Sequence, residues 1–420
     1  MKNNSLPVLV AGAGPSGLAT ALSLGLQGVD VIVVEREPGL TVDLRAGSFH
    51  PPTTDMLVKL GCTEMLEKGI KVPVWQIRDR IDGIIAEFDL SLIASETAYP
   101  FRLHLEQHRL TPMLLQQIET RTPNVAVRFG NGLETVEDHG ERIVATLDNG
   151  DVIEAAFVIG CEGARSVVRK AIGGNFVGFT WPEKLLVAST TFNLGTLGFA
   201  GAGYIADPVN FAAVFHVPDD GPPGLWRIAY SIDPEVPDED VMAEPEVRTR
   251  LKQVLEHTGA DVDAFDLKYR STYKVHQRVA DTWHSGRMAI AGDAAHLNNP
   301  FGGLGLNGGV HDAVNIAEKL GPVWLNGGEH QSVFALYQAQ RRPTNIKAVQ
   351  AMSIRNKKLL EERDPAVRRQ RQDEIRAISR DPVKARAFLM ETSMIRSVRE
   401  AAAITLENSV DAEWSGETIA

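Results

Sequence analysis

The chain is poor in cysteine, in positive charge and in long apolar runs, and each shortage excludes a class of protein. Its 420 residues include two cysteines, Cys62 and Cys161, so no disulfide framework holds the fold, and the count fits a reducing cytoplasm. The 43 Lys and Arg residues against 54 Asp and Glu leave a net charge of −11. This charge argues against a nucleic-acid partner and against binding to an anionic membrane surface.

Segments typical of membrane, secreted or metal-dependent proteins are also missing from the sequence. The first apolar run, Leu6–Ala11, breaks at Gly12 and is too short for a secretory signal. No window reaches the roughly 18 apolar residues that a membrane-spanning helix needs. His, Cys and acidic residues form no cluster with metal-ligand spacing, and no Gly-x-Ser-x-Gly elbow occurs. We therefore expect a cytoplasmic protein with no metal site.

The first forty residues contain a dinucleotide-binding pattern. An apolar strand, a Gly-x-Gly-x-x-Gly turn, a helix, a second strand and an acid follow one another at Leu6–Ala11, Gly12–Gly17, Leu18–Leu26, Val29–Val34 and Glu35. Gly12 permits the tight turn, Gly14 lets backbone approach a pyrophosphate, and Gly17 lets helix and strand pack closely. The helix N-terminus favours phosphate, and Glu35 can accept hydrogen bonds from ribose hydroxyls. The pattern predicts a dinucleotide site but does not distinguish FAD from NAD.

A second strand–loop–helix unit lies about 280 residues further along the chain. The apolar strand Met288–Ala291 leads into Gly292-Asp293, a glycine-rich loop follows up to Gly309, and a helical pattern covers Val310–Leu320. Asp293 would stand at the carboxyl end of a strand, which is where α/β proteins place ligands.

A third motif, the segment Gly160–Ser166, lies between these two in the sequence. The three motifs in this order resemble those of a known family. The chain resembles the single-component FAD-dependent aromatic hydroxylases, the 4-hydroxybenzoate hydroxylase family, over most of residues 6–345. The resemblance implies an α/β fold: a discontinuous Rossmann-like FAD-binding domain, an inserted, mainly antiparallel β-sheet substrate domain and a helical C-terminal tail. It also implies FAD as cofactor and NAD(P)H as co-substrate, with no separate nicotinamide domain.

The implied domains are interleaved along the chain. We expect the FAD-binding domain at 1–73, 102–178 and 272–345, the substrate-binding domain at 74–101 and 179–271, and a helical region at 346–420. Strand-like stretches in the insert are Leu185–Leu194, Phe211–Val217 and Trp226–Ile232. The charged tail is expected to be a solvated helical face rather than a basic patch.

The resemblance assigns cofactor roles to individual residues. Asp293 resembles the aspartate that holds the ribityl chain, and Pro300 the proline whose carbonyl lies near the oxygen-carrying flavin carbon. Backbone amides of Leu306 and Asn307 would meet the flavin pyrimidine edge. The expected cofactor-binding residues are Gly12, Gly14, Ser16, Gly17, Glu35, Arg36, Arg45, Gln107, Glu162, Arg165, Asp293, Pro300, Gly303, Gly305, Leu306 and Asn307.

Some of these assignments have a plain structural alternative. Arg45 could be a surface ion pair and Gln107 a solvated helix residue. Glu162 stands where the family usually has aspartate, which puts its contact with the nicotinamide cofactor in doubt. Asn298-Asn299 replace the commoner prolines or histidines before Pro300. These two asparagines could face the substrate or satisfy the loop backbone.

The implied reaction hydroxylates a phenolic or related aromatic ring. NAD(P)H reduces FAD, dioxygen adds to give a flavin hydroperoxide, and its distal oxygen attacks the ring. Since a phenolate is more nucleophilic than a phenol, a proton acceptor is expected near the ring. Besides Pro300, the expected catalytic residues are His216, which titrates near neutral pH, and Tyr230 on the next strand. An ordinary sheet position is the alternative for both.

Other functions of the same fold stay open at this point. The alternatives are a halogenase, an epoxidase or a reductase. A halogenase usually carries Trp-x-Trp, but the six tryptophans of this chain never stand two apart. A non-catalytic binding protein would not need the intact loop Gly292–Asn307. The insert lacks an obvious arginine cluster, which favours an uncharged or weakly acidic phenol. The identity of that phenol, NADH versus NADPH and a homodimeric state are left open.

Overall fold

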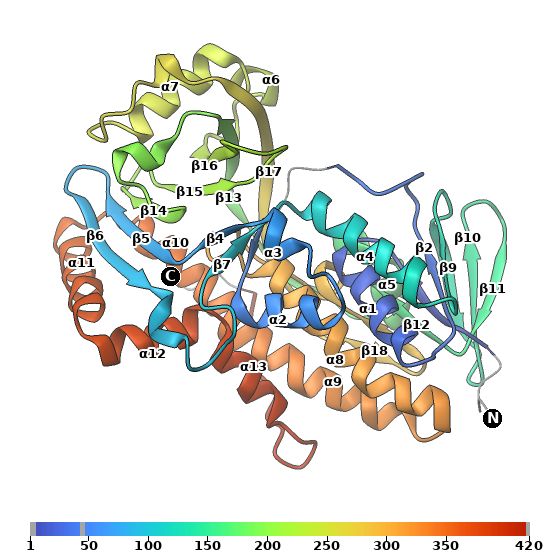
Figure 1. The fold of residues 1–420 in the computed structure, drawn as a ribbon. Coiled ribbons are helices and arrows are strands. Elements are labelled where there is room, and N and C mark those ends of the chain that lie inside the picture. The colour runs from blue at the N-terminus through green and yellow to red at the C-terminus, as the bar shows by residue number, and fades with distance from the viewer. Residues whose placement is uncertain (1–5, 43–46, 417–420) are drawn as a thin grey trace.

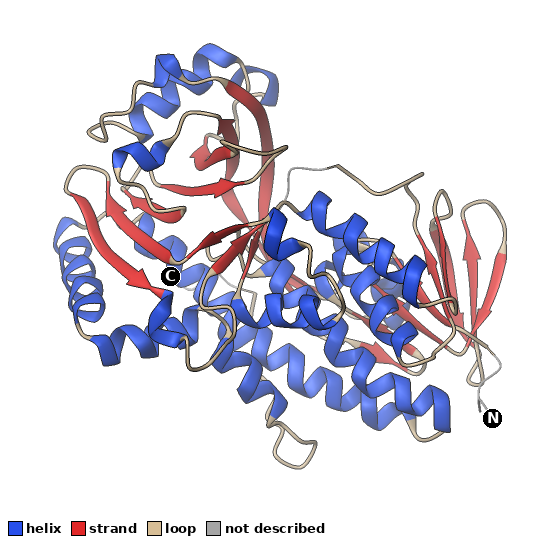
Figure 2. Cartoon of the chain, in the orientation of Figure 1, coloured by secondary structure: helices blue, strands red, loops and turns tan. Residues whose placement is uncertain are grey.

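The structure, a computed structural model, describes residues 6–42 and 47–416 and contains two large sheets surrounded by helices (Figure 2). The N-terminal and C-terminal ends of the described chain lie far apart in the view of Figure 1. Within the described residues, no helix is both long and apolar enough to cross a membrane.

The first sheet has six strands in the order β18-β19-β12-β1-β2-β8. Their bounds are β1 Val8–Ala11, β2 Val31–Val34, β8 Val125–Arg128, β12 Phe157–Gly160, β18 His284–Ser285 and β19 Met288–Ile290. All pairings are parallel except β18–β19. Strand β1 is completely buried, which explains its uninterrupted apolar sequence.

Helices pack on the first sheet and carry its loops. Helix α1 (Pro15–Leu26) packs against α4 (Gln107–Arg121) and α8 (Gly305–Asn326), and α8 packs in turn on α9 (His330–Thr344) (Figure 1). The shorter helices here are α2 Pro51–Lys59, α3 Met65–Lys68 and α5 Val167–Ile172. The helical pattern expected at 310–320 thus belongs to a longer helix, α8.

Two small antiparallel sheets flank this body. One is a meander of β9 (Leu133–Asp138), β10 (Ile143–Leu147) and β11 (Val152–Ala155). The other has the order β3-β7-β4, with β3 Ser48–Phe49, β4 Ile70–Val72 and β7 Arg102–His104. Strands β4 and β7 lie between the two large sheets (Figure 1).

The second large sheet has eight strands in the order β20-β17-β13-β16-β15-β14-β5-β6. Their bounds are β5 Val74–Asp79, β6 Gly83–Asp89, β13 Phe176–Thr190, β14 Ala202–Ala206, β15 Ala212–Val217, β16 Leu225–Ile232, β17 Leu267–Ala280 and β20 His296–Leu297. Only β14 and β5 pair in parallel. The mainly antiparallel sheet expected from the sequence is confirmed, and β17 ties it to β20 in the late glycine-rich segment.

Both faces of the second sheet are covered, because the side chains of each strand alternate between them. On the outer face, Leu186, Val214 and Ile228 pack with the helices α6 (Asp238–Val241) and α7 (Glu244–Val254). On the inner face, Leu185 and Ala229 belong to a core shared with the late glycine-rich segment and the C-terminal helices.

The C-terminal region is helical, as expected. After a π-helical turn at Asn345–Gln350 come α10 Ala351–Leu360, α11 Pro365–Arg380, α12 Pro382–Thr392 and α13 Ile395–Ala402. These helices are not merely a solvated face: Phe388 of α12 stacks on Trp75 and Phe88, with ring centroids 5.9 and 4.5 Å apart. Short 3₁₀ turns lie at Leu90–Ile93, Gly163–Arg165, Leu194–Leu197, Val262–Ala264 and Gly292–Ala294.

Candidate functional site

The first glycine motif forms the turn between β1 and α1. Gly12 has a positive φ of +99°, and a Cβ on Gly17 would lie 1.9 Å from the Gly12 carbonyl oxygen. Gly14 differs from both, since its backbone is extended (φ −72°, ψ 178°) and a Cβ there would meet no atom within 4 Å. Gly12 and Gly17 therefore serve the fold, whereas Gly14 borders open space.

Glu35 closes the motif at the end of β2. Its carboxylate accepts hydrogen bonds from the Ala13 amide at 2.7 Å and from the Glu37 amide at 3.0 Å. The neighbouring Arg36 points elsewhere: it donates to the Leu133 carbonyl at 3.3 Å and lies 3.7 Å from Asp148, with 65 % of its side chain exposed. Glu35 is thus held at the glycine turn, and Arg36 lies on the surface beside β9 and β10.

The three sequence motifs meet at the carboxyl ends of β1, β12 and β19. A Cβ on Gly12 would lie 2.5 Å from the Cys161 carbonyl oxygen of the middle motif. A Cβ on Gly292 or on Gly309 would lie 2.4 Å from the Ser16 hydroxyl oxygen. Ser16 therefore packs between the two late glycines, and segments almost 280 residues apart in sequence form one surface.

The late motif exposes the positions that the resemblance assigns to the flavin. Asp293 is exposed between the buried Gly292 and Ala294, and Pro300 is exposed between two fully buried neighbours, Asn299 and Phe301. Asp293 and Pro300 thus present surface that a ligand can cover, and the surface that they form with the start of α8 is called the wall.

Helix α8 begins at this wall with amides that have no partner inside the helix. Its first intrahelical bond is donated by Gly308 to the Leu304 carbonyl, so the amides of Gly305, Leu306 and Asn307 precede it. The Asn307 side chain accepts from the His50 amide and donates to the Ser48 carbonyl, each at 2.8 Å. These bonds fix the helix start against β3. A Cβ on Gly303 would likewise contact Ser48 at 3.4 Å.

Asp312 of α8 lies in a buried cluster of charged and polar groups. Asp312 accepts hydrogen bonds from His296 at 2.8 Å, from the Gly292 amide at 3.1 Å and from Arg341 at 2.7 Å. Burial alone would raise the pKa of Asp312, but Arg341 and His296 outweigh it and lower that pKa to about 2. His296 thus has a structural role in the late motif.

The middle motif uses its glutamate internally. Glu162 accepts from the amides of Val167 and Val168, both at 3.1 Å, and from the Ser166 hydroxyl at 2.7 Å, which caps α5. Burial raises its pKa. Arg165 is exposed on the adjacent 3₁₀ turn. The longer side chain that departs from the family pattern is therefore engaged in a helix cap.

Two further expected cofactor residues come from the segment around β3 and β7. Gln107 is half-buried as the first residue of α4, directly after β7. Arg45 lies outside the described residues. Of the two loop asparagines, Asn299 satisfies the loop backbone. Its side chain accepts a hydrogen bond from the Phe301 amide and donates one to the Gln277 side chain, both at 3.1 Å.

The residues present fit an FAD molecule. Gly14 leaves room where a pyrophosphate would approach, the first-turn amides of α8 are available, and exposed Asp293 and Pro300 lie between buried residues. Residues of the three motifs would hold the cofactor, with helix N-termini facing its anionic groups.

His216 and Tyr230 lie on the outer face of the second sheet, away from Pro300. The His216 ring stacks on Trp226 with centroids 4.8 Å apart, and its Nε2 lies 2.8 Å from the Pro223 carbonyl oxygen. Tyr230 is fully buried in the core with α7, which raises its pKa. Because side chains alternate along a strand, both point away from the inner face. The structure therefore does not support the expected contacts of His216 and Tyr230 with a substrate ring.

Sequence reasoning missed the aromatic side chains on the inner face. The rings of Tyr204 and Phe211 lie 6.0 and 5.7 Å from the ring of Phe301, next to Pro300. Burial raises the pKa of the Tyr204 hydroxyl to about 12. The alternation Ala202-Gly-Tyr204 was the available signal, but it does not reveal which face is inward.

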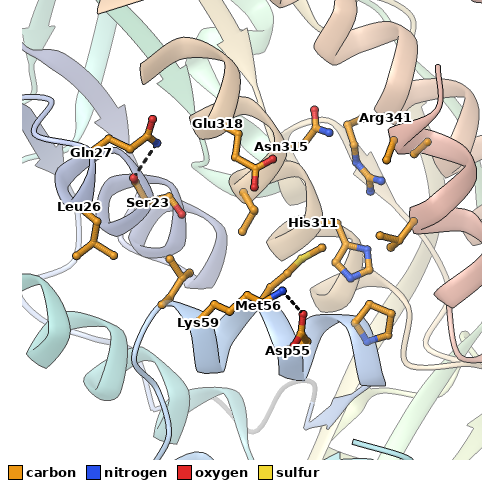
Figure 3. A pocket seen from close by; sticks show the side chains of 16 residues that line it. Ser23, Leu26, Gln27, Asp55, Met56, Lys59, His311, Asn315, Glu318 and Arg341 are labelled. Carbon is orange, nitrogen blue, oxygen red and sulfur yellow. Dashed lines mark hydrogen bonds and ion pairs between the residues drawn. The ribbon is translucent and has the colours of Figure 1, made fainter. Parts of the chain in front are cut away.

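A separate cavity of about 510 Å³ lies between α1, α2, α8 and α13 (Figure 3). His311 and Arg341 point toward it from one side, and Asp55 and Lys59 form an ion pair of 2.6 Å at its edge. It contains none of the residues expected to bind cofactor or substrate.

Comparisons with known proteins agree with this geometry. Residues 5–352 match the family described as an FAD binding domain. The chain is 33 % identical over 398 residues to a para-nitrophenol 4-monooxygenase of Pseudomonas sp. (strain WBC-3), covering 93 % of this chain and 96 % of that protein. It is 28 % identical over 375 residues to a probable NADH-specific resorcinol 4-hydroxylase of Rhodococcus jostii (strain RHA1), covering 87 % and 68 %. The crystal structure of p-nitrophenol 4-monooxygenase from Pseudomonas putida DLL-E4 superposes with a TM-score of 0.87 at 31 % identity, covering 94 % and 98 %.

Proposed function

The chain belongs to the FAD-dependent aromatic monooxygenases, and from this premise we propose that its substrate is a phenol with a single ring and a para substituent. One observation carries the proposal: the chain matches a para-nitrophenol 4-monooxygenase over almost the full length of both proteins. The resorcinol hydroxylase to which it is also similar is named for another one-ring phenol.

The inner face supports a small substrate. Phe388, Trp75 and Phe88 stack on one another and fill the end of this face formed by β5 and β6. Nearer Pro300, the rings of Tyr204 and Phe301 lie 6.0 Å apart between centroids. We propose that the substrate ring binds where these two residues meet the loop at 298–303.

The reaction we assign is ring hydroxylation with NAD(P)H and dioxygen. One oxygen atom enters the ring and the other leaves as water: NAD(P)H, a proton, dioxygen and the arene give NAD(P)⁺, the hydroxylated arene and water. When bound, FAD supplies the redox chemistry that links hydride oxidation to dioxygen activation.

The protein's own residues bind and orient the reactants. The turn at Gly12–Gly17 and Glu35 would hold the adenosine diphosphate part of the cofactor, and Asp293 its ribityl chain. Amides of Leu306 and Asn307 would donate to its pyrimidine edge and stabilise negative charge there. Gln107, the first residue of α4, would also contact the cofactor. Buried Phe301 and Tyr204 would keep water from the reacting ring.

A substrate panel tests the proposal. Purified holoprotein is mixed with NADH or NADPH and with one-ring phenols, ring compounds lacking a hydroxyl, and polycyclic phenols. We expect one-ring, para-substituted phenols to stimulate NAD(P)H oxidation and to yield a product containing one atom from isotopically labelled dioxygen. Stimulation by polycyclic phenols alone, or by none of the phenols, would contradict the proposed substrate class.

A further inference from the structure

Arg102 is the one buried arginine in the described part of the chain that has no polar partner. Five arginines there are buried: Arg102, Arg169, Arg227, Arg341 and Arg342. Arg169 donates to the carbonyls of Ala164 and Ala294. Each of the other three pairs with a carboxylate: Arg227 with Glu106, Arg341 with Asp312 and Arg342 with Asp411. Arg102 forms no hydrogen bond or ion pair with any described residue, although 93 % of its surface is buried (7 % exposed), and its Nε atom is fully enclosed.

The position of Arg102 is set by the small sheet between the two large ones. In β7 the side chains alternate, so Arg102 and His104 share one face, whereas Leu103 enters the core of the FAD-binding part. The guanidinium lies 5.1 Å from the centroid of the Trp75 ring on β5. Trp75 belongs to the inner face, so Arg102 faces the second sheet.

The same contacts connect Arg102 to the proposed substrate position. The Trp75 ring meets the Tyr204 ring edge to face, with centroids 5.6 Å apart, and Tyr204 is also a neighbour of Arg102. The Tyr204 ring in turn lies 6.0 Å, between centroids, from the ring of Phe301, the residue that follows Pro300. Arg102 therefore lies where the inner face approaches the flavin loop.

No neighbouring group among residues 6–42 and 47–416 compensates the positive charge of Arg102. Burial lowers the pKa of His104 to about 4 and that of His50 well below its usual value, so both are neutral at pH 7. Tyr204 is neutral as well, because burial raises its pKa to about 12. The nearby carboxylate of Glu106 lies 3.3 Å from Arg109 and 3.7 Å from Arg227 and is occupied by them.

A buried charge without a partner destabilises a folded protein, and arginine keeps its proton in proteins. An anion that binds there would supply the missing partner. We propose that Arg102 binds the ionised hydroxyl oxygen of the phenol and thereby makes the enzyme selective for phenols that are acidic enough to ionise at neutral pH. The inference rests on the proposed function, whose substrate class it narrows.

The surroundings favour a phenolate over a carboxylate. The groups around Arg102 include the aromatic rings of Trp75 and Tyr204, which offer few donors to a strongly hydrated anion. A phenolate that shares its charge with a ring and an electron-withdrawing substituent costs less to remove from water. The hydroxyl proton leaves to bulk water, and Arg102 remains protonated and donates its N–H groups to the oxygen.

The test measures binding to oxidised holoprotein, without NAD(P)H, so turnover does not enter. The variants are Arg102→Met, which keeps the apolar stem on Trp75, and Arg102→Lys, which keeps the charge. The control is Arg78→Met. Arg78 lies on β5, the strand that carries Trp75, but on its outer face, where the guanidinium is 4.2 Å from the centroid of the Phe199 ring. The ligands are 4-nitrophenol, the far less acidic 4-methylphenol, nitrobenzene and benzoate. The absorbance of nitrophenol reports its ionisation directly.

We expect the wild-type affinity for 4-nitrophenol to rise with pH as the free phenol ionises. Arg102→Met should bind the ionised form roughly ten to a hundred times more weakly, as for the loss of one charge-assisted hydrogen bond, and should show no such rise. Arg102→Lys should retain part of the affinity, and Arg78→Met all of it. Since an unpaired buried charge is removed, the thermal midpoint of Arg102→Met should be equal to or higher than that of the wild type.

The inference is overturned if Arg102→Met binds ionised nitrophenol as tightly as the wild type, or if its affinity for nitrobenzene falls equally. Tighter wild-type binding of benzoate than of nitrophenol would also overturn it, in favour of a carboxylate. If Arg102→Met does not fold, the pH profiles of the wild type and of Arg102→Lys still decide. Failure of the wild type to bind any one-ring phenol would instead overturn the proposed function itself.

Discussion

Two glycines of the same turn should fail in different ways when each is replaced by alanine. Gly14 has an extended backbone that any residue adopts, and a Cβ there meets no protein atom within 4 Å. Gly14→Ala should therefore leave the apoprotein intact or stabilise it by up to about 1 kcal/mol, through the lower entropy of the unfolded chain. Its methyl group would occupy the space in which the cofactor's pyrophosphate approaches.

The expected loss in Gly14→Ala is one of FAD affinity. Displacing the pyrophosphate by a methyl group should remove at least one hydrogen bond between a backbone amide and a phosphate, worth about 1.5–3 kcal/mol. This corresponds to roughly ten- to 150-fold weaker FAD binding. In Gly17→Ala the new Cβ would lie 1.9 Å from the Gly12 carbonyl oxygen, so backbone must move. Overpacking of this kind costs about 1–3 kcal/mol or more and acts on the apoprotein.

The assay separates the two effects. Thermal unfolding of the apoproteins followed by circular dichroism measures the cost to the fold, and titration with FAD followed by flavin fluorescence measures the cost to binding. Wild-type FAD affinity in Gly14→Ala would show that the cofactor does not approach this position. A drop in the apoprotein midpoint of Gly14→Ala as large as that of Gly17→Ala would refute the assignment of open space.

Three further substitutions test other parts of the site. Asp312→Asn removes the charge that pairs with Arg341 and His296 and should destabilise the holoprotein at pH 7 by roughly 3 kcal/mol. Because the folded pKa of Asp312 is lowered to about 2 from 3.8, its stabilisation is present above pH 4 and is lost as the pH falls toward 2. The difference in thermal midpoint between wild type and Asp312→Asn should thus narrow at pH 3; an equal gap at both pH values would contradict this. Asp293→Ala should weaken FAD binding roughly ten- to a hundredfold in a fluorescence titration; unchanged affinity would remove Asp293 from the cofactor site. His216→Gln should leave the ratio of hydroxylated product to hydrogen peroxide unchanged, since its ring stacks on Trp226 on the outer face; a rise in peroxide would return His216 to the substrate site.

The cofactor half of the molecule could be predicted from sequence because its signals are local. The turn at Gly12–Gly17 needs particular backbone geometry, and β1 is buried on both faces, so composition alone indicates turn and strand. The late strand–loop–helix unit carries the same kind of signal. The mixed α/β fold with its second, mainly antiparallel sheet was accordingly predicted correctly.

The substrate half could not be predicted in the same detail because its strands do not show which face is inward. In Phe211–Val217 both sets of alternating side chains are largely apolar, since α7 covers the outer face. Val247, Leu251 and Val254 of α7 carry the helical spacing that would have revealed this cover. The missing partner of Arg102 is a tertiary property: burial of an arginine and absence of a carboxylate beside it leave no mark in the sequence.

The interleaved topology has a consequence for the synthesis of the protein on the ribosome. Strand β1 and its neighbours β2 and β12 are complete once residue 160 has emerged, but β19, which pairs with β12, begins only at Met288. Until then β12 is an open edge, and the wall formed by Asp293 and the start of α8 does not exist. FAD can therefore bind in full only after three quarters of the chain has been made. During that interval the nascent first sheet depends on other means, such as a chaperone or its own helices, to avoid pairing with another chain.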